Sequence, residues 1–378
     1  MATKHTKFSL GMRNILDDKT KEILDKVEIV ENLSRKKFLW QFILGLIEVR
    51  KVQFSEVATS LNNAVKPSSN ERRIQSFFEK VELNYEGLSV LLCLFLPKGK
   101  VTLSMDRTDW KFGNFDINIL VVVARCGNLG IPIYFEMLDN KRGSSSTEDR
   151  KNIIEKSIKL LSFRGIELVV MDREFIGHLW LKYLKDNKIN FCVRVPKSHY
   201  ITLKNECIYT IEELLSTQNE RFYHDVRVDG VWVNLYIKKL SNGDFLYLIG
   251  TLPAKRLGDL YRKRWCIETL FQSLKGRGFD LESSHLRDID KFKKLFSLVC
   301  VAFTICLTIG RVYVSKVQKV KINKEGYPLK SIFRRGLDWM REYIKGKYQS
   351  IFEDLIHKFT RWVNMQLAYN QKLIKIIG

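Results

Sequence analysis

The run of apolar segments between residues 99 and 198 constrains the fold more than any other part of the chain. It contains, in order, three β-rich runs (KVTLSMD, INILVVVARCG and IPIYFEMLD), a helical run, the buried strand IELVVMD, a second helical run and the strand FCVRVP. Gly and Asn separate the first three runs, which is typical of turns between strands. The order βββαβαβ predicts a mixed α/β layer built around one sheet.

The sequence changes in character on either side of this segment, which predicts the domain boundaries. Residues 1–98 are expected to be helical, and residues 199–250 contain strand-like runs with turns at VDG and SNGD. The expected organisation is a helical N-terminal region (1–98), the first part of the core (99–198), a β-strand insertion (199–250), the second part of the core (251–310) and a helical C-terminal region (311–378).

One segment of the N-terminal region has features of a DNA reader. Ser68 and Glu71 have capping-box spacing, which predicts a helix that begins near Ser69, with Arg72 and Arg73 flanking its apolar stripe. A short helix, a turn and a capped helix with early arginines are compatible with a helix-turn-helix DNA reader. An ordinary three-helix packing unit explains the same pattern equally well.

Two of the predicted core strands end in an aspartate. The run VTLSMD ends at Asp106 and the run ELVVMD ends at Asp172. A charge beside a core is costly unless it is paired or bound to a metal. Either aspartate could simply mark the exit of its strand into solvent, but two such endings in one sheet favour metal binding.

The stretch YRKRWCIETLFQSLKGRG, from Tyr261 to Gly278, is predicted to be a basic helix with a single acid, Glu268. At 100° per residue, Tyr261, Arg264, Glu268 and Lys275 fall within an arc of about 60°. Glu268 and its basic neighbours are therefore expected to share one face. The alternative is a surface helix in which Arg264 and Glu268 form an i,i+4 pair worth a few tenths of a kcal/mol.

Three carboxylates and a strongly basic chain suggest phosphodiester chemistry. Asp106, Asp172 and Glu268 could hold two Mg²⁺ ions about 4 Å apart, and Mn²⁺ suits the same oxygen ligands. The formal net charge of +22 favours nucleic acid as a partner, although a solvated basic surface would give the same number. Arg264 and Lys275 are expected to bind DNA phosphates. The seven cysteines include no CxxC pair, which disfavours a zinc site and favours a reducing compartment.

Taken together, these motifs resemble a bacterial insertion-sequence transposase of the DDE class. Tyr261, Arg264, Glu268 and Lys275 match the Y-x2-R-x3-E-x6-K signature of one cut-and-paste subgroup, and SMDRTDW and VVMDREF match its two aspartate motifs. The resemblance covers roughly residues 100–310. It implies an RNase H-like core with a β-strand insertion between the second and third acids, and Mg²⁺ held by Asp106, Asp172 and Glu268.

The same resemblance implies partners and a reaction. Tyr261, Arg264 and Lys275 would contact phosphates of double-stranded DNA at the element's terminal inverted repeats. Cleavage would free a 3′-OH, form and reopen a hairpin, and insert the element into target DNA, with a homodimer in the synaptic complex. Trp232, in the insertion, is a candidate for holding a flipped base, with core packing as the stronger alternative.

The remaining expectations concern neighbouring residues, location and rival functions. Glu174 is expected to be peripheral, and Trp265 to be a core residue of its helix. The 16-residue apolar run Leu295–Gly310 is too short to span a bilayer and is expected to be a buried core helix. With no signal peptide found, the expectation is a soluble, cytoplasmic, nucleoid-associated protein without a membrane partner. A metal-dependent nuclease without strand transfer and a non-catalytic DNA-binding relative remain the alternatives.

Overall fold

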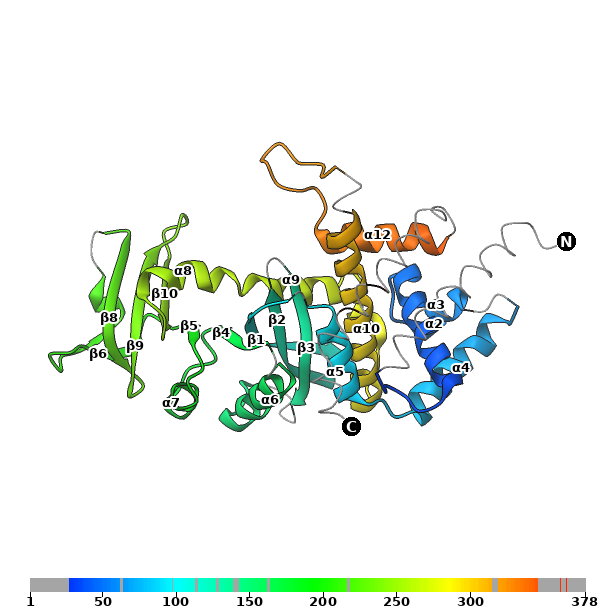
Figure 1. Cartoon of the computed structure of the whole chain (residues 1–378), viewed down its shortest axis with the longest axis horizontal. Coiled ribbons are helices and arrows are strands. Elements are labelled where there is room, and N and C mark those ends of the chain that lie inside the picture. The colour runs from blue at the N-terminus through cyan, green and yellow to red at the C-terminus, as the bar shows by residue number, and fades with distance from the viewer. Residues whose placement is uncertain are drawn as a thin grey trace. The chain divides into compact units, whose positions relative to one another are not determined.

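The structure is a computed structural model of the whole chain (Figure 1). It describes residues 27–61, 64–96, 98–112, 115–126, 129–138, 143–161, 164–215, 218–314 and 319–345, together with residues 361 and 365. The chain divides into two units. One comprises Met1–Phe95, Trp110–Phe115 and Leu270–Gly378, and the other comprises Leu96–Asp109 and Asp116–Thr269. We call them the helical unit and the sheet unit.

The sheet unit is built on ten strands in the order β3-β2-β1-β4-β5-β10-β9-β8-β6-β7. β1 pairs with β4 and β4 pairs with β5 in parallel, whereas β2–β3, β5–β10 and the remaining pairs through β9, β8 and β6 are antiparallel. The strands are β1 (Val101–Phe112), β2 (Phe115–Cys126), β3 (Leu129–Leu138), β4 (Ile166–Met171), β5 (Phe191–Arg194), β6 (Tyr200–Thr202), β7 (Ile208–Thr210), β8 (Glu220–Val228), β9 (Val231–Lys239) and β10 (Phe245–Gly250).

Helices cover this sheet because its central strands are apolar on both faces. Leu168 to Met171 of β4 are all fully buried, as expected for a parallel strand covered on both sides. Helices α6 (Thr147–Leu160) and α7 (His178–Asp186) contact each other on one side, and α8 (Ala254–Arg262) packs on β10, β9, β5 and β4 (Figure 1). The short helix η1 (Glu212–Leu214) lies beside β7.

The predicted fold class is confirmed: a mixed α/β protein with a sheet core and flanking helices. The order β1-β2-β3-α6-β4-α7-β5 is the βββαβαβ order expected from the sequence, and β3-β2-β1-β4-β5 is the strand order of an RNase H-like sheet. The three strand-like runs expected over residues 199–250 form β8, β9 and β10, and two short strands that were not predicted, β6 and β7, precede them. These strands extend the same sheet, because β10 pairs with β5.

Two details of the predicted secondary structure are wrong. β1 does not end at Asp106 but continues to Phe112, because Thr108 and Trp110 alternate with exposed residues and give it a further half-buried stretch. The single basic helix predicted from Tyr261 onward is two helices, α8 and α9 (Trp265–Leu274), separated by a turn at Lys263 and Arg264. In that turn the amide of Arg264 donates to the carbonyl of Tyr261, a tightened i−3 bond.

The helical unit packs around α10 (Ile289–Ile309), which contacts α2, α4, α5 and α12. By length and composition α10 could cross a membrane, but 94% of its most apolar window is buried inside the protein. Lys294 of α10 is itself buried and donates to the carbonyl of Phe78 over 2.8 Å. The other elements are α2 (Leu33–Val49), α3 (Phe54–Ser60), α4 (Pro67–Lys80), α5 (Tyr85–Leu94), η2 (Leu281–Ser284), the π-helical turn η3 (Gly310–Val314) and α12 (Ile332–Ile344).

Candidate active site

The parallel pairing of β1 and β4 brings the first two acids together. Met105 is the register partner of Met171, so Asp106 and Asp172 occupy equivalent positions one residue further along neighbouring strands. Both aspartates directly follow the last paired residues of β1 and β4. Since adjacent strands lie about 4.8 Å apart, the two residues are neighbours at that end of the pairing. Both side chains are largely buried, with 17% of Asp106 and 29% of Asp172 exposed.

The third acid is positioned by α8, the turn after it and α9. Leu257 and Leu260 of α8 sit in a buried cluster with residues of β4, β5, β9 and β10, and Tyr261 packs against it. In the turn, Lys263 pairs with Glu167 at 3.1 Å and donates to the hydroxyl of Thr102 at 3.3 Å. Glu268 then lies in the first turn of α9.

The start of α9 lies very close to β3. A Cβ atom added to Gly130 would come 2.8 Å from the Cβ of Cys266, which is closer than real Cβ atoms approach. The Sγ of Cys266 in turn lies 3.6 Å from the hydroxyl of Ser104 on β1. The absence of a side chain at Gly130 therefore lets α9 carry Glu268 close to the strands that carry the aspartates.

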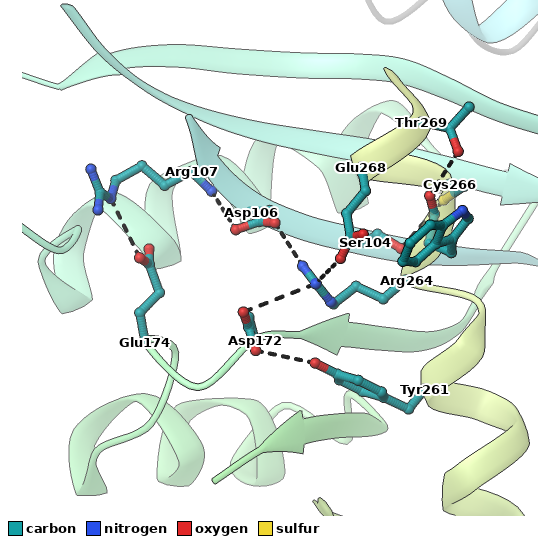
Figure 2. A network of polar contacts seen from close by, with 11 residues as sticks. Ser104, Asp106, Arg107, Asp172, Glu174, Tyr261, Arg264, Cys266, Glu268 and Thr269 are labelled. Atoms are coloured by element: carbon teal, nitrogen blue, oxygen red, sulfur yellow. Dashed lines mark hydrogen bonds and ion pairs between the residues drawn. The ribbon is translucent and has the colours of Figure 1, made fainter. Parts of the chain in front are cut away.

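All three carboxylates converge on the guanidinium of Arg264 (Figure 2). Nη1 donates to Oδ2 of Asp106 at 2.7 Å, Nη2 lies 4.0 Å from Oδ2 of Asp172, and Nη2 also pairs with Oε1 of Glu268. The hydroxyl of Tyr261 donates to Oδ1 of Asp172 at 3.1 Å. The structure thus brings together five residues singled out by the sequence: Asp106, Asp172, Tyr261, Arg264 and Glu268.

The electrostatics of this cluster show an excess of negative charge. Burial raises the pKa of Asp106 to about 6, against the opposing effects of Arg264 and of the backbone N–H of Arg107. Burial alone would lower the pKa of Arg264, but Tyr261 and the three carboxylates outweigh it and raise that pKa. One guanidinium shared by three ionised carboxylates leaves two negative charges, so the cluster suits additional cations.

Further contacts, which the sequence did not predict, hold the segments that follow Asp106 and Asp172 in place. Arg107, directly after Asp106, pairs with Glu174 at 3.4 Å (Figure 2). Arg107 also donates to Asn118 at 3.0 Å. The buried Arg150 of α6 donates to the carbonyls of Glu174 at 3.0 Å and Ile176 at 3.3 Å. The side chain of Glu174 therefore links the segment after β4 to β1, a role that the sequence did not predict.

A cavity of about 520 Å³ adjoins the cluster on the side of Arg264 and Glu268. Its basic lining residues are Arg194, Lys238, Lys255, Arg262 and Arg264. Trp265 also lines this cavity and is 64% exposed, so its expected place in the core is wrong. The buried stripe of α9 consists instead of Ile267, Leu270 and Leu274.

The other predicted DNA-binding residues lie elsewhere in the structure. Lys275 follows α9 in the helical unit, where its ammonium lies 5.2 Å from the ring of Trp110 and 3.7 Å from Glu282. Trp232, on β9, is 39% exposed, with the guanidinium of Arg227 over its ring.

Arg72 and Arg73 are both exposed on α4, which begins at Pro67 and packs against α3. The guanidinium of Arg73 lies 4.9 Å from the ring centre of Phe38. The contact between α3 and α4 is expected both of a helix-turn-helix DNA reader and of an ordinary packing unit.

The carboxylates fit a magnesium site in their chemistry but are held apart by Arg264. Within the described part of the chain, no three His, Cys, Asp or Glu side chains are already gathered as a metal-binding group. Asp106, Asp172 and Glu268 nevertheless offer only oxygen ligands and share one centre, now filled by the guanidinium. They would hold a metal once that group moved away.

Comparison with known proteins identifies the family of the chain. Residues 100–305 match the family described as Transposase DDE domain, so the chain belongs to that family. A cryo-EM structure of piggyBac transposase in a synaptic complex with hairpin DNA shows a weak similarity. Its TM-score is 0.46 at 12% identity, over 86% of this chain and 76% of that one. No curated protein matches the sequence.

Proposed function

We propose that this transposase cuts DNA at the ends of its element and joins them to target DNA, with Asp106, Asp172 and Glu268 as its metal ligands. The observation that carries the proposal is the convergence of these three carboxylates from β1, β4 and α9 on one buried point. Two divalent cations at that point would supply activation of the attacking oxygen and stabilisation of the leaving oxygen. Mg²⁺ is the expected metal, and Mn²⁺ would replace it.

The protein's own groups hold and orient the DNA. Tyr261 and Arg264 border the cavity beside Glu268, where a phenol and a guanidinium can donate to a phosphate. Lys275 would add a phosphate contact as a point charge. Burial keeps Asp106 and Arg264 out of bulk water, which strengthens their interactions with a phosphate or a cation.

The finer assignment follows the signature of the sequence. We place the chain in the bacterial insertion-sequence subgroup marked by Tyr261, Arg264, Glu268 and Lys275, which implies cut-and-paste movement through a hairpin. A homodimer would then bring two inverted repeats together in the nucleoid of the cytoplasm. Arg72 and Arg73 of α4 are proposed DNA contacts in the helical unit, and Trp232 is a proposed base contact in the sheet unit.

A cleavage assay tests the proposal. The full-length protein is incubated with linear DNA that carries the ends flanking its own gene, with Mg²⁺ or with EDTA, and the products are mapped. The proposal requires metal-dependent nicks at the end boundary, hairpin ends and joined products. Nicks without joining would favour the nuclease alternative, and binding without nicks would favour the non-catalytic one.

A matched pair of variants separates the chemistry from binding. Glu268→Gln should abolish nicking and keep DNA binding, because it removes a proposed metal ligand. Glu148→Gln makes the same change on α6 at a side chain that is 72% exposed, and should cut like the wild type. Loss of DNA binding by Glu268→Gln would assign Glu268 a structural role instead.

A further inference from the structure

Arg264 fills the space that the proposed metals need. Its side chain is 11% exposed, and its guanidinium contacts carboxylates from all three acidic positions (Figure 2). Arginine keeps its charge in proteins, so it cannot release the carboxylates by losing a proton. A carboxylate oxygen that accepts from the guanidinium is not available to a cation at the same time, so metal entry requires this side chain to move.

An anion bound in the cavity beside the three carboxylates could contact the guanidinium of Arg264 in their place. Five cations line this cavity (Arg194, Lys238, Lys255, Arg262 and Arg264) against three acids (Glu220, Asp259 and Glu268), which leaves a surplus of positive charge suited to a phosphate. A guanidinium binds phosphate in the same two-pronged way as carboxylate. A DNA phosphate in the cavity would therefore compete with the acids for Arg264.

We infer that Arg264 couples DNA binding to metal binding, because its guanidinium leaves the three carboxylates when it binds a DNA phosphate. Without DNA it pairs with Asp106, Asp172 and Glu268 and excludes cations. A DNA phosphate draws the guanidinium away and leaves the three carboxylates for the metals. Each ligand then raises the affinity for the other by the same factor, since coupling between two binding sites is reciprocal. This inference rests on the proposed function of the acids.

Mn²⁺ binding to the full-length protein tests the coupling without any turnover. Free Mn²⁺ is measured by electron paramagnetic resonance with and without a short DNA duplex, and binding by the duplex alone is subtracted. The wild type should bind Mn²⁺ more tightly with DNA, by about fivefold or more. Arg264→Gln should bind Mn²⁺ more tightly without DNA and gain little when DNA is added.

Two further variants keep the test decisive. Arg264→Lys retains a cation in the cluster but not the fork that reaches three acids, so its Mn²⁺ affinity should be intermediate. Arg256→Gln removes the same charge from an exposed site on α8 and should behave like the wild type. Equal Mn²⁺ affinity of the wild type and both Arg264 variants would overturn the coupling. Unchanged Mn²⁺ binding in Glu268→Gln would instead overturn the proposed function.

A second inference concerns an exposed hairpin in the helical unit, residues 319–330. Asn323 organises its turn by accepting from the amides of Glu325 and Tyr327, and the amide of Leu329 donates to the carbonyl of Lys321 at 2.9 Å. The hairpin nevertheless leaves four large apolar side chains exposed: Val320 at 43%, Ile322 at 59%, Tyr327 at 70% and Leu329 at 62%. An ordered segment with such side chains in solvent is typical of a binding surface.

The charge of the hairpin indicates which partner it fits. The hairpin carries four lysines, Lys319, Lys321, Lys324 and Lys330, against the single acid Glu325, a net charge of +3, and Lys330 also pairs with Asp338 at 2.6 Å. Lysines spaced among apolar side chains suit duplex DNA, with phosphates beside the charges and apolar groups in a groove. We propose that the 319–330 hairpin binds duplex DNA.

Two pairs of substitutions test the hairpin by fluorescence anisotropy with a short duplex over a series of salt concentrations. Lys321→Gln with Lys324→Gln should flatten the plot of log affinity against log salt by about 0.9 for each lost contact. Tyr327→Ser with Leu329→Ser should weaken binding without flattening the plot. Lys159→Gln with Lys188→Gln removes equal charge from exposed positions of the sheet unit and is the control.

The outcomes separate this proposal from its rivals. Wild-type binding by both hairpin variants would overturn it while leaving the proposed function intact. A change of sedimentation from dimer to monomer, with DNA binding retained, would assign the surface to a second copy. A wild-type protein that binds no duplex would overturn the proposed function itself.

Discussion

Replacing Asp106 with asparagine should stabilise the metal-free protein at neutral pH. The side chain of Asp106 is largely buried, and its pKa is raised from 3.8 to about 6. At about 1.36 kcal/mol for each pKa unit, ionising this carboxyl costs the fold about 3 kcal/mol. Asparagine has nearly the same shape, can still accept from Arg264 and carries no charge, so Asp106→Asn avoids this cost.

The raised pKa of Asp106 determines how the free energy of unfolding of the wild type changes with pH. The folded protein holds the proton of Asp106 at a pH where the unfolded chain has released it. Between pH about 4 and about 6 the folded state binds more protons, so the free energy of unfolding falls as the pH rises through this window. The free energy of unfolding of Asp106→Asn lacks this contribution to the pH dependence. The difference in unfolding free energy between Asp106→Asn and the wild type should therefore grow by about 3 kcal/mol as the pH rises from about 4 to about 6.

Urea unfolding at a series of pH values, in EDTA, measures this difference. Tryptophan fluorescence and circular dichroism should give the same midpoint, and both proteins should have the same dependence on urea, before the free energies are compared. With a short DNA duplex present, adding Mg²⁺ should then stabilise the wild type and not Asp106→Asn, because a bound ligand stabilises the folded state. A difference between the two proteins that does not change with pH would refute the reasoning.

Three further results are expected. Glu268→Gln should lose Mg²⁺-dependent nicking in a gel assay while its DNA affinity stays within about twofold of the wild type, since it alters a metal ligand and no proposed phosphate contact. Lys275→Ala should lower the slope of log affinity against log salt by about one, and an unchanged slope would remove Lys275 from the phosphate contacts. Gly130→Ala should cost about 1–3 kcal/mol in urea unfolding, because its Cβ would meet Cys266 at 2.8 Å. Gly276→Ala, which has open space around it, is the control and should cost far less.

Much of the catalytic geometry could be predicted from the sequence because it depends on strand order and short spacings. The βββαβαβ pattern placed the segments of Asp106 and Asp172 in one sheet, and the parallel register of β1 and β4 sets the two side by side. The spacing of Tyr261, Arg264 and Glu268 kept all three on one side of the chain even though the predicted helix is broken. The assignment of these residues as ligands and DNA contacts stays a prediction.

The break between α8 and α9 could not be predicted, because Lys263 and Arg264 are both good helix formers. It coincides with their long-range partners, Glu167 and Thr102 for Lys263 and the three acids for Arg264. Tertiary contacts of this kind override local preference.

One pairing that was missed and one residue that was misplaced concern side chains whose surroundings depend on distant segments. The pairing of Arg107 with Glu174 joins residues far apart in the sequence, and no local pattern marks it. Trp265 lies about 200° around the helix from Ile267, which begins the buried stripe of α9, so the helical period could have placed it outside the core. Its apolar character alone misled the prediction.

The most direct test of the central claim is a crystal structure of the full-length protein with Mn²⁺ and a DNA duplex, recorded at the manganese absorption edge. The account predicts anomalous density between Asp106, Asp172 and Glu268, with the guanidinium of Arg264 turned away toward a phosphate. Density at another place, or an unmoved Arg264 with no manganese among the three carboxylates, would contradict it.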